Sequence, residues 1–457
     1  MRQIANSMAQ VLPFPNVGGA AVSPIDCFIR VGGAHRKLAD LYAAGRLPAR
    51  RIVIDASRHR HQRELITALR DAGAEVVLDT EIAELASLAK CAGHSRNAPW
   101  APGDGRPLGP DYFQESSPSS DVIGSIARFA ITERFDTVLA PTHFLGDPTY
   151  DNWLDVDRRA CQRLRRALDS EGGSHITIDY PLILPHVMLN DTAARGAIVA
   201  SLADLPVENV WFRASGLGPD AGPLTLRRYL LAISALHNLG KPVIADYLGG
   251  LTSLASLAFG VVSGLSHGIG ERERFDAGGW HKSPPPRDDD AEFGRTVRVS
   301  IPGVGRSATL NELDVLASAR GGRRLVACGD PGCCLHGYSD MISDPRRHSA
   351  NQLFKAISDL ERVPDLRRET YFLEGPMTDA DRLARQIRLL RPSIAEANRR
   401  KVDLGALMKR FEEHSHRLGQ TLTMLEDLHQ LRGDEGPRVI PLRARYSSDN
   451  KTKESRR

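Results

Sequence analysis

Half of the cysteines of this chain lie in one short segment, Cys328-Gly-Asp-Pro-Gly-Cys333-Cys334-Leu-His336, out of six in 457 residues. The Gly-Asp-Pro-Gly turn folds the backbone so that the sulfurs on its two sides approach each other. Thiolates about 4 Å apart, together with one imidazole, are the ligands of tetrahedral zinc, whose Zn–S bonds are about 2.3 Å long. The segment therefore predicts a zinc site, with the ligands Cys328, Cys333, Cys334 and His348. His336 is the other candidate for the fourth ligand.

Two other interpretations of these cysteines stay open. The adjacent Cys333 and Cys334 also suit a strained redox pair, and all three suit small buried residues. Six cysteines are too few for a secreted disulfide scaffold, and their clustering suits a reducing cytoplasm. The most apolar stretch, 249–270, is interrupted by glycine, serine and His267, so no membrane span is expected. We expect a soluble cytoplasmic protein.

The composition allows a large core and excludes a strongly basic protein. Hydrophobic residues make up 41% and charged residues 25% of the chain, and the formal net charge is only +4. No overall positive field therefore indicates a nucleic-acid partner. Arginine is nevertheless concentrated in four stretches that are candidates for phosphate contacts. These stretches are 46–51, 158–166, 346–347 and 443–457.

Short apolar, β-branched segments alternate with helix-like patterns over the first part of the chain. The expected strands are 26–31, 51–56, 75–79, 137–141, 175–184, 209–214, 242–247 and 261–267. Eight strands, each followed by a helix or loop, predict a (β/α)8 TIM-like barrel. A doubly wound open sheet is the competing fold, but the loop after the first strand, Val31-Gly-Gly-Ala, makes a poor phosphate-binding turn.

The regions outside the barrel pattern set the expected domain organisation. We predict an N-terminal extension at 1–24, the barrel at 25–270, an insertion with the metal site at 271–345, a C-terminal helical region at 346–440 and a disordered basic tail at 441–457. Three helical patterns follow the cysteines, at 346–362, 378–397 and 402–431. The long excursion 91–120, rich in Pro, Gly and Ser, is typical of a functional lid or an insertion.

Charged or imidazole side chains stand at the ends of seven expected strands. Because the carboxyl ends of barrel strands converge on one pocket, these side chains are candidate site residues. The candidates for catalysis are Asp79, His143, Asp179 and His267. The candidates for substrate binding are Asp55, Arg213 and Asp246, with Gly216, Gly218 and Gly249, whose backbone a ligand can approach closely. An aspartate after a strand is also a common helix N-cap, and a single histidine is often a core residue.

The arrangement resembles the tRNA-guanine transglycosylase superfamily, including its DNA-acting paralogues that install 7-deazaguanine bases. Cys334-Leu-His-Gly-Tyr338-Ser339 is similar to the last zinc cysteine of that family and its following Tyr-Ser. Val77-Leu-Asp79 stands where the family has its pocket aspartate, and Ser215-Gly216-Leu217-Gly218 stands near its base-binding loop. The resemblance implies a barrel with a zinc site after the eighth strand, which acts on a purine-type base in nucleic acid.

The stretch after the eighth strand differs from that family. The family's nucleophilic aspartate follows this strand, whereas here the nearest carboxylate is Glu271. A covalent glycosyl intermediate needs such a carboxylate. Three hypotheses follow. The first is a transglycosylase-like protein that exchanges or binds a base in DNA or RNA. The others are a barrel lyase or hydrolase for a small molecule, and an inactive subunit that recognises nucleic acid or a partner protein.

Overall fold

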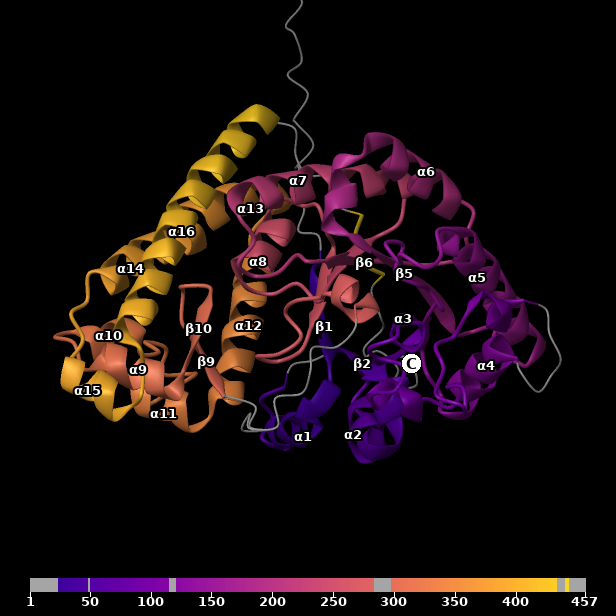
Figure 1. Ribbon diagram of the computed structural model, residues 1–457, viewed down its shortest axis with the longest axis horizontal. Helices are drawn as coiled ribbons and strands as arrows, with labels where there is room; N and C mark the ends of the chain where they lie inside the picture. The colour runs from indigo at the N-terminus through magenta and orange to yellow at the C-terminus, as the bar shows by residue number, and fades with distance from the viewer. Residues whose placement is uncertain (1–23, 48–49, 115–120, 283–296, 434–439, 444–457) are drawn as a thin grey trace, which may run out of the picture.

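Eight parallel strands close into a barrel in chain order, as the alternating pattern predicts (Figure 1). The computed structural model describes residues 24–47, 50–114, 121–282, 297–433 and 440–443. The strands are β1 (Asp26–Arg30), β2 (Arg51–Asp55), β3 (Glu75–Asp79), β4 (Thr137–Leu139), β5 (Thr177–Pro185), β6 (Val210–Ser215), β7 (Val243–Asp246) and β8 (Gly264–His267). β8 pairs with β1, so the fold is a (β/α)8 barrel rather than an open sheet. Most of the predicted N-terminal extension and basic tail lies outside the described residues.

The side chains inside the barrel form layers because alternate residues of each strand point inward. The middle layer is apolar and contains Phe28, Val53, Val77, Leu139, Trp211 and Ile244. Two residues further along the strands, the inward positions are charged, as at Arg30 and Asp55. The strands are buried on both faces, which explains their nearly continuous apolar sequences.

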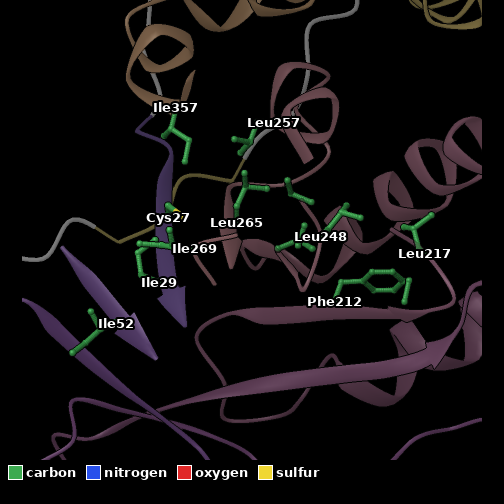
Figure 2. Close-up of a cluster of buried hydrophobic side chains, with 14 of the residues drawn as sticks. Cys27, Ile29, Ile52, Phe212, Leu217, Leu248, Leu257, Leu265, Ile269 and Ile357 are labelled. Carbon is green, nitrogen blue, oxygen red and sulfur yellow. The ribbon is translucent and has the colours of Figure 1, made fainter. Parts of the chain in front are cut away.

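Helices form the outer ring of the barrel. They are α1 (His35–Ala43), α2 (His59–Asp71), α3 (Ile82–Leu85), α4 (Val122–Thr132), α5 (Trp153–Ser170), α6 (Thr192–Leu202), α7 (Pro223–Ser234) and α8 (Gly250–Ala258). α12 (Pro345–Glu361) contacts both α8 and α1 and therefore takes the place of the helix that follows β8. Figure 2 shows its Ile357 beside the outward side chains of the barrel, above Cys27 of β1 and near Leu257 of α8.

An insertion separates β8 from α12. It contains the hairpin β9 (Arg298–Ile301) and β10 (Arg306–Thr309), followed by α9 (Leu310–Ala317), α10 (Gly322–Val326) and α11 (Tyr338–Ser343). After α12 come α13 (Arg368–Phe372), α14 (Thr378–Arg388), α15 (Ile394–Arg399) and the long α16 (Leu404–Arg432). α13 contacts α8 and α12, whereas α14, α15 and α16 lie beside the insertion, at the left of Figure 1. The predicted helix 378–397 is interrupted at Pro392, because proline cannot donate the hydrogen bond that a helix interior requires.

Two segments of the chain cover the ends of the barrel. Residues 271–281, which we call the mouth segment, cross the C-terminal mouth and bond to the loops after β6 and β7. At the other end, Leu442 packs into the apolar middle layer. The Oγ of Ser263 donates to the carbonyl of Ile440 at 2.5 Å, and Arg51 donates to the carbonyl of Arg443 at 2.7 Å. No helix in the described ranges is both long enough and apolar enough to cross a membrane.

Candidate functional site

Six charged side chains meet inside the C-terminal mouth of the barrel. We call this set the charged ring, and its members are Arg30, Asp55, Asp79, Arg213, Asp246 and Arg272. Arg30 donates two hydrogen bonds to Asp246, at 2.7 and 2.6 Å, and one to Asp79 at 2.8 Å. Arg213 bridges the same two carboxylates at 2.7 Å. Arg272, from the mouth segment, binds Asp55 through two nitrogens at 2.8 and 2.5 Å.

The charged ring has three aspartates and three arginines, and all of them are buried except Arg272, which is partly exposed. Burial raises the pKa of the Asp79 carboxyl, but Arg213 and Arg30 outweigh burial and hold it below its ordinary value. The pKa of Asp246 is lowered in the same way by these two arginines. Both aspartates are therefore ionised at neutral pH and are poor proton acceptors. As ionised carboxylates, they accept strong hydrogen bonds from donor groups.

An aromatic side chain covers the charged ring from the mouth. The ring centroid of Tyr247 lies 4.2 Å from the guanidinium carbon of Arg30 and 5.4 Å from that of Arg213, in cation–π contact. Phe275 of the mouth segment packs on Tyr247 with ring centroids 5.1 Å apart. The backbone of Tyr247 has a φ of 57°, which is unusual for a residue with a side chain. Such a conformation persists where the surroundings enforce it, as they do here.

The glycines that we expected to border a ligand border the mouth segment. The backbone N–H of Gly216 donates to the carbonyl of Phe275, and that of Gly249 donates to the carbonyl of Glu273. A Cβ on Gly249 would lie 2.5 Å from the Cγ of Glu273, and a Cβ on Gly218 would lie 2.6 Å from the Nε of Arg274. These glycines therefore provide the room in which the mouth segment lies. The chain itself occupies the place that we predicted for a ligand.

The structure brings Asp55, Asp79, Arg213 and Asp246 together as expected, but it does not bring His143 to them. The ring of His143 stacks on Trp153 of α5 at 3.7 Å between centroids, and its Nδ1 lies 2.6 Å from the Oδ1 of Asp157. The next residue, Phe144, belongs to the apolar cluster at the mouth. His143 therefore points away from the mouth, into the layer between barrel and helices.

Asp179 lies inside the barrel, but at its N-terminal half. It is the third residue of the nine-residue β5, which continues to Pro185. Its carboxylate accepts hydrogen bonds from Asn209 at 3.0 Å and from the indole of Trp211 at 2.7 Å. Burial raises the pKa of Asp179 to about 7 despite these bonds. Our placement of Asp179 at a strand end was wrong, because Asp179 lies inside the expected strand 175–184 and inside β5, which ends at Pro185.

His267 ends β8 but faces outward. It pairs in register with Ile29, whose side chain belongs to the outer core, while the neighbouring Ser266 pairs with the inward-facing Phe28 and Asp246. The Nδ1 of His267 lies 2.7 Å from the carbonyl of Gly268. The expected convergence of His143, Asp179 and His267 on Asp79 is therefore not observed.

Two acids next to Asp79 were missed in the sequence. Burial and the nearby Asp55 raise the pKa of Glu81 to about 8, and burial and Asp79 raise the pKa of Glu84 to about 7. Glu81 accepts a hydrogen bond from the backbone N–H of Ser57 at 2.7 Å and has a φ of 53°. The spacing Asp79-Thr-Glu81-Ile-Ala-Glu84 directly after an apolar strand was the available signal.

The predicted metal ligands lie close together and are buried. The metal-binding atoms of Cys328, Cys333, Cys334 and His348 all lie within 4.8 Å of one another. The Sγ atoms of Cys333 and Cys334 are 3.6 Å apart, and they lie 3.3 and 3.5 Å from the Nδ1 of His348. Tetrahedral zinc needs about 3.8 Å between two sulfurs and about 3.6 Å between sulfur and nitrogen. The spacing therefore fits a metal ion of this type.

The surroundings orient the ligands toward a common centre. The Nε2 of His348 lies 3.1 Å from the carbonyl of Ser300, which can only accept, so Nε2 carries the proton and Nδ1 is free to bind metal. Three side chains on one face of α12, His348, Gln352 and Lys355, contact the cysteine segment. Lys355 binds Asp330 at 2.8 Å, and the carbonyl of Asp330 accepts the N–H groups of Cys333 and Cys334.

The donor set suits zinc, and it suggests a structural role. Three thiolates and one imidazole supply four protein ligands, so a bound ion would have no open position for a substrate. Such an ion would hold the cysteine segment against the first turns of α12. His336 does not belong to the cluster; its N–H donates to Asp340 at 2.9 Å.

No protein-family model and no curated protein matches this chain.

Proposed function

We propose that this chain is a transglycosylase-like barrel that binds a purine-type base of nucleic acid at its C-terminal mouth, with zinc in the Cys3His centre. One observation carries the proposal. The insertion with the three cysteine ligands interrupts the barrel between β8 and α12, the helix that completes the outer ring and supplies His348 as the fourth ligand. This is the position that the resemblance to the tRNA-guanine transglycosylase superfamily implies.

The chemistry of the charged ring suits a purine base. A guanine-like edge combines N–H donors with O and N acceptors. Asp79 and Asp246 offer carboxylate oxygens to the donors, and Arg30 and Arg213 offer N–H groups to the acceptors. Tyr247 lies over the two guanidinium groups and supplies an aromatic face on which a planar base can stack.

Binding at the mouth requires the mouth segment to move. Arg272 and Phe275 of the mouth segment contact Asp55 and Tyr247, so a base at the mouth would replace these two contacts. The first carboxylate after β8 in the described residues is Glu271, whose Oε2 lies 3.5 Å from Arg346. Because base exchange needs a carboxylate at the sugar carbon, we place base recognition first and treat exchange as a further step to be measured.

Calorimetric titration with guanine and 7-deazaguanine, and fluorescence anisotropy with labelled DNA and RNA, test the proposal. We expect a purine to bind and nucleic acid to bind more weakly as salt is raised. Asp79→Asn should weaken purine binding about tenfold or more, whereas Asp71→Asn at an exposed position should not. Thermal melting checks that both variants are folded.

Incorporation of labelled guanine into DNA or RNA then separates exchange from recognition alone. Purine binding that Asp79→Asn leaves unchanged would overturn the assignment of the mouth. If no nucleic acid binds even at low salt, the barrel acts on a small molecule instead and the proposal is wrong.

A further inference from the structure

A cavity of about 850 Å³ lies outside the barrel, between the loops after β7 and β8 and the insertion. One wall contains Gly250 and Leu251 from the first turn of α8, with Gly268 and Gly270 after β8. The hairpin β9–β10 and one face of α12 form the opposite wall. Apolar side chains, among them Leu254 and Leu353, line its interior. Its size suits a ligand as large as a nucleotide.

Two arginines of the hairpin, Arg298 and Arg306, bring positive charge to this cavity. In the described parts of the chain, neither Arg298 nor Arg306 forms an ion pair with a carboxylate. Arg298 donates to the Oγ of Ser307 at 3.1 Å and to its carbonyl at 2.8 Å. The guanidinium of Arg306 lies 5.6 Å from the ring centroid of Phe411. Burial lowers the pKa of Arg306, and nearby arginines, first Arg417, lower it further.

The other charges at the cavity are mostly matched. Arg272, Arg274 and Lys355 pair with Asp55, Asp220 and Asp330. Three of the four carboxylates in the lining are held by arginines, as the pairs Asp220–Arg274, Asp359–Arg362 and Asp379–Arg382; Glu273 is the fourth. Arg298 and Arg306 are therefore the cations that remain available to an anion.

One ring nitrogen of a buried histidine in the lining also has no partner in the described part of the chain. His267 is only 4% exposed, and its Nε2 has no hydrogen-bond partner among the described residues. An unmet buried polar atom is costly unless a ligand or water completes it. The loops after strands seven and eight are also where many barrels hold phosphate, with help from the start of a helix.

We propose that this cavity binds a phosphate-bearing ligand of nucleotide size, with the phosphate at Arg298 and Arg306 and the remainder against the apolar wall. The site adjoins the charged ring, because Arg272 belongs to the ring and also lies in the cavity lining. The two arginines that would bind the phosphate lie on the hairpin, so substitutions there test this site apart from base recognition at the mouth.

Calorimetric titration of the whole protein with inorganic phosphate, guanosine monophosphate and a short single-stranded oligonucleotide tests the site. We expect Arg298→Gln and Arg306→Gln each to weaken binding about tenfold or more, because each removes charge-assisted hydrogen bonds. Arg320→Gln makes the same charge change at an exposed position outside the lining and should have no effect. Melting curves confirm that the three variants are folded.

The three probes separate the sources of the phosphate. Binding of the mononucleotide, lost in both cavity variants, identifies a small ligand. Binding of the oligonucleotide alone, with the same dependence on Arg298 and Arg306, assigns the site to a phosphate of a nucleic-acid strand. If no probe binds, or if probes bind equally to the wild type and both cavity variants, the proposal is wrong.

Discussion

The Nε2 of His348 lies 3.1 Å from the carbonyl oxygen of Ser300, and this contact joins α12 to β9. It leaves the Nδ1 of His348 facing the sulfurs of Cys333 and Cys334, at 3.3 and 3.5 Å. The metal ligand His348 thus belongs to α12, a helix of the barrel, and is held by a hydrogen bond to β9, a strand of the insertion. The cluster of Cys328, Cys333, Cys334 and His348, which we call the Cys3His centre, therefore joins the insertion to α12.

Loss of one ligand should release this connection. We expect Cys334→Ser to lose bound zinc and to lower the free energy of unfolding by more than about 4 kcal/mol, because the ion binds only the folded arrangement. Cys91→Ser changes a buried thiol outside the cluster and should keep the metal. Metal content and thermal melting of both variants measure the difference; equal zinc in the two would contradict the ligand assignment.

Removal of one arginine from the charged ring should strongly lower the free energy of unfolding. Arg213→Met leaves Asp79 and Asp246 buried with one arginine fewer, which should cost about 3–5 kcal/mol of stability. The exposed Arg63 pairs with Glu133 at 2.6 Å, and Arg63→Met should cost less than about 1 kcal/mol. Urea denaturation measures both values. Similar costs for the two substitutions would mean that the ring is not buried as described.

Glu81 should make stability depend on pH. Its pKa of about 8 in the folded protein lies above the ordinary 4.5, so the folded state holds the proton longer than the unfolded state. The contribution of Glu81 to the free energy of unfolding is therefore fully present below about pH 4.5. This contribution falls as pH rises toward 8, by up to about 1.4 kcal/mol for each pH unit. Glu81→Gln should reduce this fall, whereas Glu64→Gln at an exposed position should not. Unfolding at several pH values decides; parallel curves for Glu81→Gln and the wild type would refute the prediction.

The mouth segment should respond to a methyl group at Gly249. A Cβ there would meet the Cγ of Glu273 at 2.5 Å, so Gly249→Ala should push residues 271–281 away from the barrel at a cost of about 1–3 kcal/mol. Gly33 has open space around it and provides the control, Gly33→Ala. Hydrogen exchange of the mouth segment should become faster in Gly249→Ala alone. Unchanged exchange would show that the segment is not packed on this glycine.

Leu442 should stabilise the barrel from its N-terminal end. It is 4% exposed and packs in one layer with Phe28 and Trp211, so Leu442→Ala should cost about 2–5 kcal/mol. Leu335 is 72% exposed, and Leu335→Ala should be nearly neutral. Chemical denaturation compares the two; a neutral Leu442→Ala would contradict the packing described here.

The strands and the metal ligands were predictable because their signals are local. Apolar, β-branched segments mark strands that are buried on both faces, and a turn between cysteines brings their sulfurs together. The direction of a side chain after a strand was not predictable. His143 and Phe144 are adjacent, yet His143 points outward and Phe144 points inward. An error of one residue in the position of the strand therefore places a side chain on the wrong face.

Contacts between distant segments were also outside the reach of local patterns. The partner of Asp55 is Arg272, far along the chain, and the predicted ligand-binding glycines Gly216 and Gly249 instead border the mouth segment. We also expected α12 to start a separate helical region. Instead, α12 packs between α8 and α1, although the whole insertion separates it from β8 in the sequence.

X-ray absorption at the zinc edge of the purified protein tests whether Cys328, Cys333, Cys334 and His348 hold zinc. We expect one zinc ion per chain, with three sulfur ligands at about 2.3 Å and one nitrogen at about 2.0 Å. A protein without zinc, or zinc with oxygen or water in its coordination shell, would contradict a closed Cys3His centre that fastens the insertion to α12.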